Sequence, residues 1–135
     1  RRRSRRYVFS YFLPANVVAA GFTAFHMCSS AGELREQLRE NTAYFRERMT
    51  AAGFDIKPGV HPISPVMLYD APLAQRFAEC LLEEGIYAIG FFFPVVPKGQ
   101  ARIRTQMSAA HTREHLDHAI EAFIRIGREL GVLKA

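Results

Sequence analysis

The most specific chemical pattern in the chain is a pair of arginines, Arg102 and Arg104, in the segment 101–107 (ARIRTQM). Polar and apolar residues alternate in this segment, as they do in a half-buried strand. Both guanidinium groups are therefore expected on one face, with Ile103 on the other. Two interpretations follow. The pair is either a fork for a carboxylate or phosphate, which arginine binds in bidentate fashion, or two solvated side chains of an edge strand.

The loop before this strand, residues 94–100 (PVVPKGQ), carries a lysine beside a glycine. The prolines stiffen the backbone, and Gly99 permits a positive φ angle or a close approach. Lys98 either meets a phosphate-bearing substrate at the mouth of a cleft or is the solvated side chain of a rigid turn.

Three histidines, His111, His115 and His118, have the spacing i, i+4 and i+7, which could align metal ligands on a helix. However, His111 precedes Thr112, the expected helix cap, and no cysteine or carboxylate completes a set with recognisable spacing. We therefore expect no metal site and assign these histidines to a polar face. No P-loop, G-x-S-x-G, H-E-x-x-H or G-x-G-x-x-G motif occurs, so the sequence does not support those NTPase, hydrolase, protease and dinucleotide-binding classes.

Residue periodicity and turn residues predict the elements that position these side chains. Helices are expected over 15–28, 32–52 and 70–84 and from Thr112 onward, and strands over 64–69, 86–93 and 101–107. The short loop between the last two strands suits an antiparallel pair. The expected fold class is α/β, an α+β sandwich in which helices cover a short, mostly antiparallel three-stranded sheet.

The predicted core comes from two helical stripes. These are Leu34, Leu38, Phe45 and Met49 in the second helix, and Leu116, Ile120, Phe123 and Leu130 in the last. The first helix is apolar nearly all round, so we expect another domain or a partner chain to cover it. Cys28 and Cys80 are expected to be buried, reduced thiols, which favours the cytoplasm or an organelle matrix.

The formal net charge is +5, and five of the 18 basic residues lie within residues 1–6. The remaining 13 basic residues balance 13 acidic ones, so the basic character belongs to a local arm. A nucleic-acid module would spread its basic residues over one face. No apolar run approaches the roughly 20 residues that span a bilayer. We expect residues 1–13 to be a basic arm and inter-domain segment, residues 14–135 to be one domain, and the chain to be part of a longer protein.

Four stretches resemble segments of one enzyme group: 90–112 (GFFFPVVPKGQARIRTQMSAAHT), 49–54 (MTAAGF), 61–68 (HPISPVML) and 3–10 (RSRRYVFS). The chain resembles the C-terminal domain of the glycine C-acetyltransferase (2-amino-3-ketobutyrate CoA ligase) family. That family belongs to the α-oxoamine synthases, which are fold-type I pyridoxal-phosphate enzymes. The stretch 3–10 resembles the segment that enters this domain.

The resemblance implies a reaction in which glycine and acetyl-CoA give 2-amino-3-oxobutyrate and CoA, or the reverse in threonine breakdown. Pyridoxal 5'-phosphate serves as the electron sink in the full-length enzyme. The family's cofactor lysine lies upstream of the matched segment. We therefore expect this chain alone to bind no covalent cofactor and to be inactive. The expected location is the cytoplasm, or the mitochondrial matrix in a eukaryote, with no membrane partner.

Two residues carry over from the family. Arg104 corresponds to the residue that holds the amino-acid carboxylate, and Arg102 becomes a supporting residue. Ser10 corresponds to a hydroxyl that reaches the cofactor phosphate of the other subunit, which implies a homodimer with shared sites. The chain has Tyr11 and Phe12 where the family usually has Asn and Ser. The alternatives are an inert dimerisation or regulatory module with the same fold, and a nucleic-acid-binding fragment that uses the arginine arm.

Overall fold

The computed structural model describes residues 13–133, which divide into two units between Leu34 and Arg35. The predicted boundary after residue 13 stays a prediction. The elements, in chain order, are α2 (Ala15–Ser30), α3 (Gly32–Ala51), β1 (Ile63–Tyr69), α4 (Ala71–Glu83), β2 (Ile89–Phe91), β3 (Ala101–Gln106) and α5 (Arg113–Glu129).

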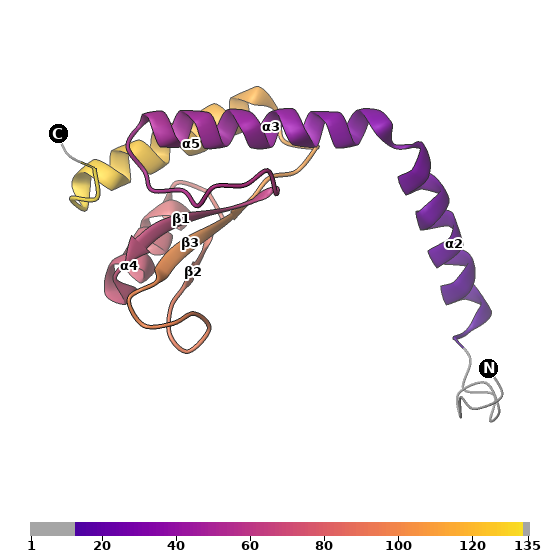
Figure 1. The fold of residues 1–135 in the computed structure, drawn as a ribbon, viewed down its shortest axis with the longest axis horizontal. Coiled ribbons are helices and arrows are strands. Elements are labelled where there is room, and N and C mark those ends of the chain that lie inside the picture. The colour runs from indigo at the N-terminus through magenta and orange to yellow at the C-terminus, as the bar shows by residue number, and fades with distance from the viewer. Residues whose placement is uncertain (1–12, 134–135) are drawn as a thin grey trace. The chain divides into compact units, whose positions relative to one another are not determined.

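The second unit is built on a three-stranded sheet with the order β1-β3-β2 (Figure 1). Strand β3 pairs antiparallel with both neighbours, so β1 and β2 run parallel to each other on its two sides. Helix α4 makes the connection between them. The predicted class, an α/β sandwich with a short antiparallel sheet covered by helices, is confirmed.

The core lies between one face of this sheet and the helices α3, α4 and α5. Each helix contributes a fully buried phenylalanine, namely Phe45, Phe77 and Phe123. The ring of Phe123 lies 6.2 Å from that of Phe45 and 5.4 Å from that of Phe77, measured between centroids. These contacts join the three helices over the sheet, as aromatic pairs at such distances commonly do.

Local sequence signals set the ends of the helices as predicted. The Asp70 carboxylate accepts a hydrogen bond from the Leu73 N–H at 2.9 Å, and Pro72 stands in the first turn of α4. The Thr112 hydroxyl accepts the N–H of His115 at 3.3 Å at the start of α5. Both caps satisfy backbone donors that have no partner inside the helix.

The predicted strand 86–93 is wrong at both ends, because only Ile89–Phe91 pairs with β3. At the start of the run, the Ile86 N–H donates to the Leu81 carbonyl at 2.8 Å and closes the end of α4. At its end, the Phe92 carbonyl accepts the Val95 N–H at 2.9 Å and begins a turn. The backbone groups at both ends of the apolar run thus form hydrogen bonds outside the sheet.

Helix α2 lies in the first unit, and none of its residues is buried. The expected burial of Cys28 is wrong, because that thiol is exposed, while Cys80 is partly buried in the second unit. Leu34, expected in the core stripe, is also exposed at 57%. Both residues fall in the first unit, where residues 13–34 form no second layer that covers them.

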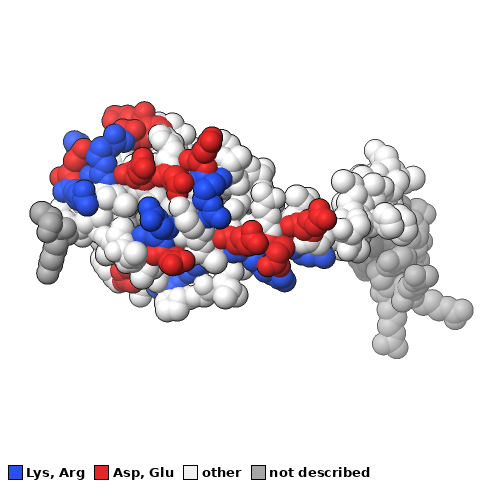
Figure 2. Space-filling model, turned by 90° about the horizontal axis from the view of Figure 1, so that it is seen from above, with Lys and Arg blue, Asp and Glu red and all other residues white. Residues whose placement is uncertain are grey.

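The helix-covered side of the second unit carries acidic and basic side chains interspersed with one another (Figure 2). This distribution fits the equal numbers of acidic and basic residues outside residues 1–6. Within residues 13–133, every helix is too short or too polar to cross a membrane.

Candidate functional site

Arg104 lies in the middle of β3 on the face of the sheet that points away from the core. Its neighbours Ala101, Ile103 and Thr105 are buried, whereas Arg104 itself is exposed. The residues directly opposite are Pro65 on β1 and Ile89 on β2. Both are apolar, so neither cross-strand position supplies a carboxylate to neutralise the guanidinium.

The contact that Arg104 makes with a side chain is an aromatic one. Its Cζ lies 5.6 Å from the centroid of the Phe91 ring. Among residues 13–133, Arg104 has no ion pair with an acidic side chain. The N–H donors of the guanidinium thus have no acidic partner among the described residues.

Arg102 occupies the same face but is engaged differently. Its Nε donates to the Gln100 carbonyl oxygen at 3.1 Å, and its Nη2 donates to the Gln100 side-chain Oε1 at 3.4 Å. These bonds turn Arg102 back toward the loop that precedes β3. The alternation pattern treats the two arginines alike, but the fold does not. Arg102 forms hydrogen bonds to the loop, whereas Arg104 is exposed and has no acidic partner among the described residues.

A cavity of about 330 Å³ is lined by Arg104 together with Tyr87, Ile89, Phe91 and Gln106. Its lining contains one cation, one amide, apolar and aromatic walls, and no acidic residue. The volume lies at the small end of the range for ligand pockets, roughly 300–1,000 Å³. A guanidinium beside apolar walls suits a small anion with two coplanar oxygens, such as a carboxylate.

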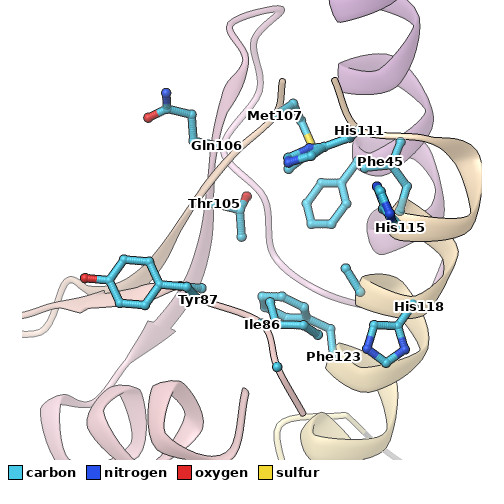
Figure 3. A pocket seen from close by; sticks show the side chains of 14 residues that line it. Phe45, Ile86, Tyr87, Thr105, Gln106, Met107, His111, His115, His118 and Phe123 are labelled. Atoms are coloured by element: carbon cyan, nitrogen blue, oxygen red, sulfur yellow. The ribbon is translucent and has the colours of Figure 1, made fainter. Parts of the chain in front are cut away.

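A second and larger cavity, of about 410 Å³, lies on the helix-covered side of the sheet (Figure 3). The core rings of Phe45 and Phe123 form part of its wall, and three histidines of the α5 region stand along it. Tyr87 and Gln106 line both cavities, but Arg104 lines only the smaller one. The larger cavity lacks a cation, whereas the smaller one holds the guanidinium that can bind an anion.

The histidines of the larger cavity are already used within the fold. The His111 Nδ1 accepts the Ser108 N–H at 3.2 Å, and the His115 Nδ1 accepts the Thr112 N–H at 3.3 Å. The His118 Nε2 lies 3.2 Å from a backbone carbonyl oxygen, which can only accept, so this nitrogen carries the proton. Each imidazole thus has a structural role.

Metal binding finds no support in the part of the chain that the structure describes. Residues 13–133 bring together no group of three or more His, Cys, Asp or Glu side chains placed to hold an ion. His111, His115 and His118, despite their spacing, do not form such a group.

Lys98 lines another cavity, of about 280 Å³, at the end of β1. Its Nζ lies 5.2 Å from the centroid of the Phe93 ring. Tyr69 lines the same cavity and donates a short hydrogen bond to Asp55. That bond raises the pKa of the Tyr69 hydroxyl above its usual value, because the bound form is the protonated one. The structure does not bring Lys98 into the cavity of Arg104.

Sequence reasoning selected Arg104 but missed the side chains around it. Ile89 and Phe91 stand two apart on β2, so their shared face could be predicted from alternation. Their position beside Arg104 depends on strand register, which alternation alone does not give. Ser10, the predicted cofactor-phosphate contact, lies outside the described residues.

The sequence relatives of the chain are consistent with one another. The family model for aminotransferase class I and II matches residues 1–123. The 2-amino-3-ketobutyrate coenzyme A ligase of Escherichia coli is 56% identical over 133 residues, which cover 98% of this chain and 33% of that protein. The mitochondrial 2-amino-3-ketobutyrate coenzyme A ligase of Homo sapiens is 47% identical over 133 residues, covering 98% of this chain and 32% of that protein.

Solved structures agree with the fold. Serine palmitoyltransferase of Sphingomonas wittichii aligns with a TM-score of 0.84 and 27% identity, covering 91% of this chain and 31% of that one. A high-resolution structure of SPT with a PLP internal aldimine aligns with a TM-score of 0.87 and 30% identity, covering 97% of this chain and 33% of that one.

The predicted resemblance to 2-amino-3-ketobutyrate CoA ligases is confirmed by these identities. The chain spans about a third of the length of the curated relatives that it matches. Because the family model covers residues 1–123, the chain belongs to the aminotransferase class I and II family.

Proposed function

We propose that this chain forms the substrate-carboxylate part of a pyridoxal-phosphate-dependent acyltransferase. The enzyme condenses glycine with acetyl-CoA to 2-amino-3-oxobutyrate and CoA, or runs in reverse in threonine breakdown. The observation that carries the proposal is Arg104, whose donors have no acidic partner within residues 13–133 and which lines a cavity without acids. The names of the most similar relatives support the same reaction.

Arg104 binds the carboxylate of glycine through two parallel N–H···O bonds. Fixing both oxygens of so small a substrate fixes the plane of its carboxylate and the direction of its Cα–C bond, which places Cα for a proton transfer. Ile89 and Phe91 keep water from one side of the ion pair and so strengthen it. Gln106 offers an amide to the same cavity.

The described residues do not by themselves fit pyridoxal phosphate. The cofactor requires an amine for its covalent link, and the lysines within residues 13–133 are Lys57 and Lys98. Neither lines the cavity of Arg104. Because the family's cofactor lysine lies upstream of the matched segment, we propose that the linking lysine belongs to a part of the enzyme outside this chain. In the whole enzyme the cofactor supplies the electron sink, and this chain supplies substrate orientation.

The proposed enzyme is a homodimer in which the Ser10 hydroxyl reaches the cofactor phosphate of the partner subunit. The resemblance of residues 3–10 supports this assignment. We propose the cytoplasm as its location in a bacterium and the mitochondrial matrix in a eukaryote, as the name of the human relative suggests for that protein.

A chimera tests the proposed function against the inert-module alternative. In the chimera, this chain replaces the matched third of the E. coli relative, to which it is 56% identical. We expect CoA release that depends on both glycine and acetyl-CoA. A folded, cofactor-loaded chimera that releases no CoA would instead favour a dimerisation or regulatory module. A nucleic-acid binding assay tests the remaining alternative. Affinity that persists without residues 1–6 would indicate a basic surface other than the arginine arm. No affinity at all would exclude the nucleic-acid-binding hypothesis.

A further inference from the structure

Arg104 has an aromatic neighbour on the adjacent strand. In the β2–β3 ladder, Ile89 stands opposite Arg104, and Phe91 stands opposite Arg102. Phe91 is therefore the diagonal neighbour of Arg104 on the same face, a position that long and aromatic side chains can reach. The guanidinium lies 5.6 Å from the ring centroid, within the range of a cation–π contact.

We propose that Phe91 is a positioning residue that presents the Arg104 guanidinium to the substrate carboxylate. The proposal rests on the proposed function of Arg104. A solvated arginine samples many rotamers and must be ordered when it binds an anion. A ring beside the guanidinium restricts these rotamers without using its N–H groups, which stay available for a bidentate carboxylate.

The other neighbours of Arg104 cannot take this role. Pro65 and Ile89 flank it from the two adjacent strands but have no aromatic face. Gln106 lines the same cavity, yet no hydrogen bond joins it to Arg104 within the described residues. Orientation of the guanidinium by this chain therefore falls to Phe91, which also lines the cavity.

A cation–π contact in the helix layer differs from this one in its surroundings. Arg113 lies 3.8 Å from the centroid of the Tyr44 ring, whose hydroxyl donates to Asp117. That cluster joins two helices and contains its own carboxylate. The contact between Arg104 and Phe91 contains no carboxylate, so an incoming anion would complete it.

Kinetics of the chimera test the positioning role. Phe91→Leu keeps an apolar side chain but removes the aromatic face, and Phe91→Tyr keeps the face. For Phe91→Leu we expect the KM for glycine to rise about two- to fivefold, the size of an exposed cation–π contact, with kcat and the KM for acetyl-CoA unchanged. Phe91→Tyr should restore the KM. Phe92→Leu is the matched control, because Phe92 is a neighbouring, partly exposed phenylalanine that does not line the cavity.

A double-mutant cycle distinguishes positioning from general structural damage. In an Arg104→Ala background, Phe91→Leu should have no further effect on the KM for glycine, because the group that it positions is gone. An equal effect in both backgrounds would contradict the proposal.

A second readout needs no activity. In the 135-residue chain itself, the Arg104 Nε–H resonance should be shifted by the Phe91 ring current. That shift should disappear in Phe91→Leu and persist in Phe91→Tyr and Phe92→Leu. A resonance that is the same in Phe91→Leu and the wild type would overturn the contact.

The outcomes separate the two proposals. A normal KM for Phe91→Leu beside a raised KM for Arg104→Ala overturns the positioning role and leaves the proposed function intact. An unchanged KM for Arg104→Ala removes the basis of both.

Discussion

Gly90 occupies the point where α4 crosses β2, and its substitution by alanine gives a prediction that can be worked from distances. An ideal Cβ at this position would lie 3.0 Å from the carbonyl oxygen of Ala74 and 3.3 Å from its carbonyl carbon. Both atoms belong to the helix backbone, so neither can rotate away. Gly90→Ala must therefore move α4 and β2 apart by a few tenths of an ångström.

Two effects of this substitution oppose each other. Overpacking of a dense core costs about 1–3 kcal/mol. Alanine also restricts the unfolded chain, which returns about 0.4–1 kcal/mol where the backbone conformation suits it, and Gly90 is not among the residues with positive φ. The net loss should be about 1–2 kcal/mol. With a urea m-value of about 1–3 kcal/mol/M, the unfolding midpoint should fall by about 0.3–2 M.

Urea unfolding followed by circular dichroism measures this shift. The matched control is Gly21→Ala in α2, where the added methyl group meets no atom within 4 Å. Alanine is favoured over glycine in a helix by about 1 kcal/mol, so the control should not lower the midpoint. A Gly90→Ala midpoint equal to or above that of the wild type would refute the reasoning, because the helix would then not rest on the strand backbone.

The remaining predictions concern the helix layer. The hydrogen bond to Asp117 raises the pKa of Tyr44, so the stability it provides is complete below the ordinary tyrosine pKa of about 10 and is lost as pH rises through the higher folded value. Above about pH 10 the urea midpoint of the wild type should therefore fall more steeply than that of Tyr44→Phe, and equal slopes would exclude the linkage. Phe123→Ala, which empties a core position in contact with three other rings, should cost about 3–5 kcal/mol by urea unfolding. Phe93→Ala, at a side chain 57% exposed, should lower the free energy of unfolding far less. Similar losses in the two variants would contradict the placement of the core around Phe123.

Local signals made much of the fold predictable. Asp70 and Thr112 mark helix starts because a cap needs only a polar side chain a few residues before an apolar stripe. The alternation in 101–107 placed Arg104 on an outward face because side chains alternate strictly along a strand. These features depend on neighbours in sequence, and they were predicted correctly.

Features that depend on distant partners were not predictable in the same way. The difference between Arg102 and Arg104 arises from a loop hydrogen bond and a diagonal ring contact, neither of which alternation encodes. The apolar run 86–93 predicts one strand, yet the Ile86 N–H bonds to the end of α4 and not to a neighbouring strand. The apolar helix around Cys28 predicts a buried thiol, but burial requires a second layer, and residues 13–34 do not form one.

The central claim is that Arg104, and not its neighbour Arg102, holds the carboxylate of glycine. The most direct measurement compares kcat/KM for glycine in chimeras that carry Arg104→Ala or Arg102→Ala. Loss of a charge-assisted hydrogen-bonded contact of about 1.5–3 kcal/mol predicts a fall of about 10- to 150-fold for Arg104→Ala. Arg102→Ala, which releases only a loop contact, should stay within about twofold. Equal losses in the two variants, or a loss confined to acetyl-CoA, would contradict the claim.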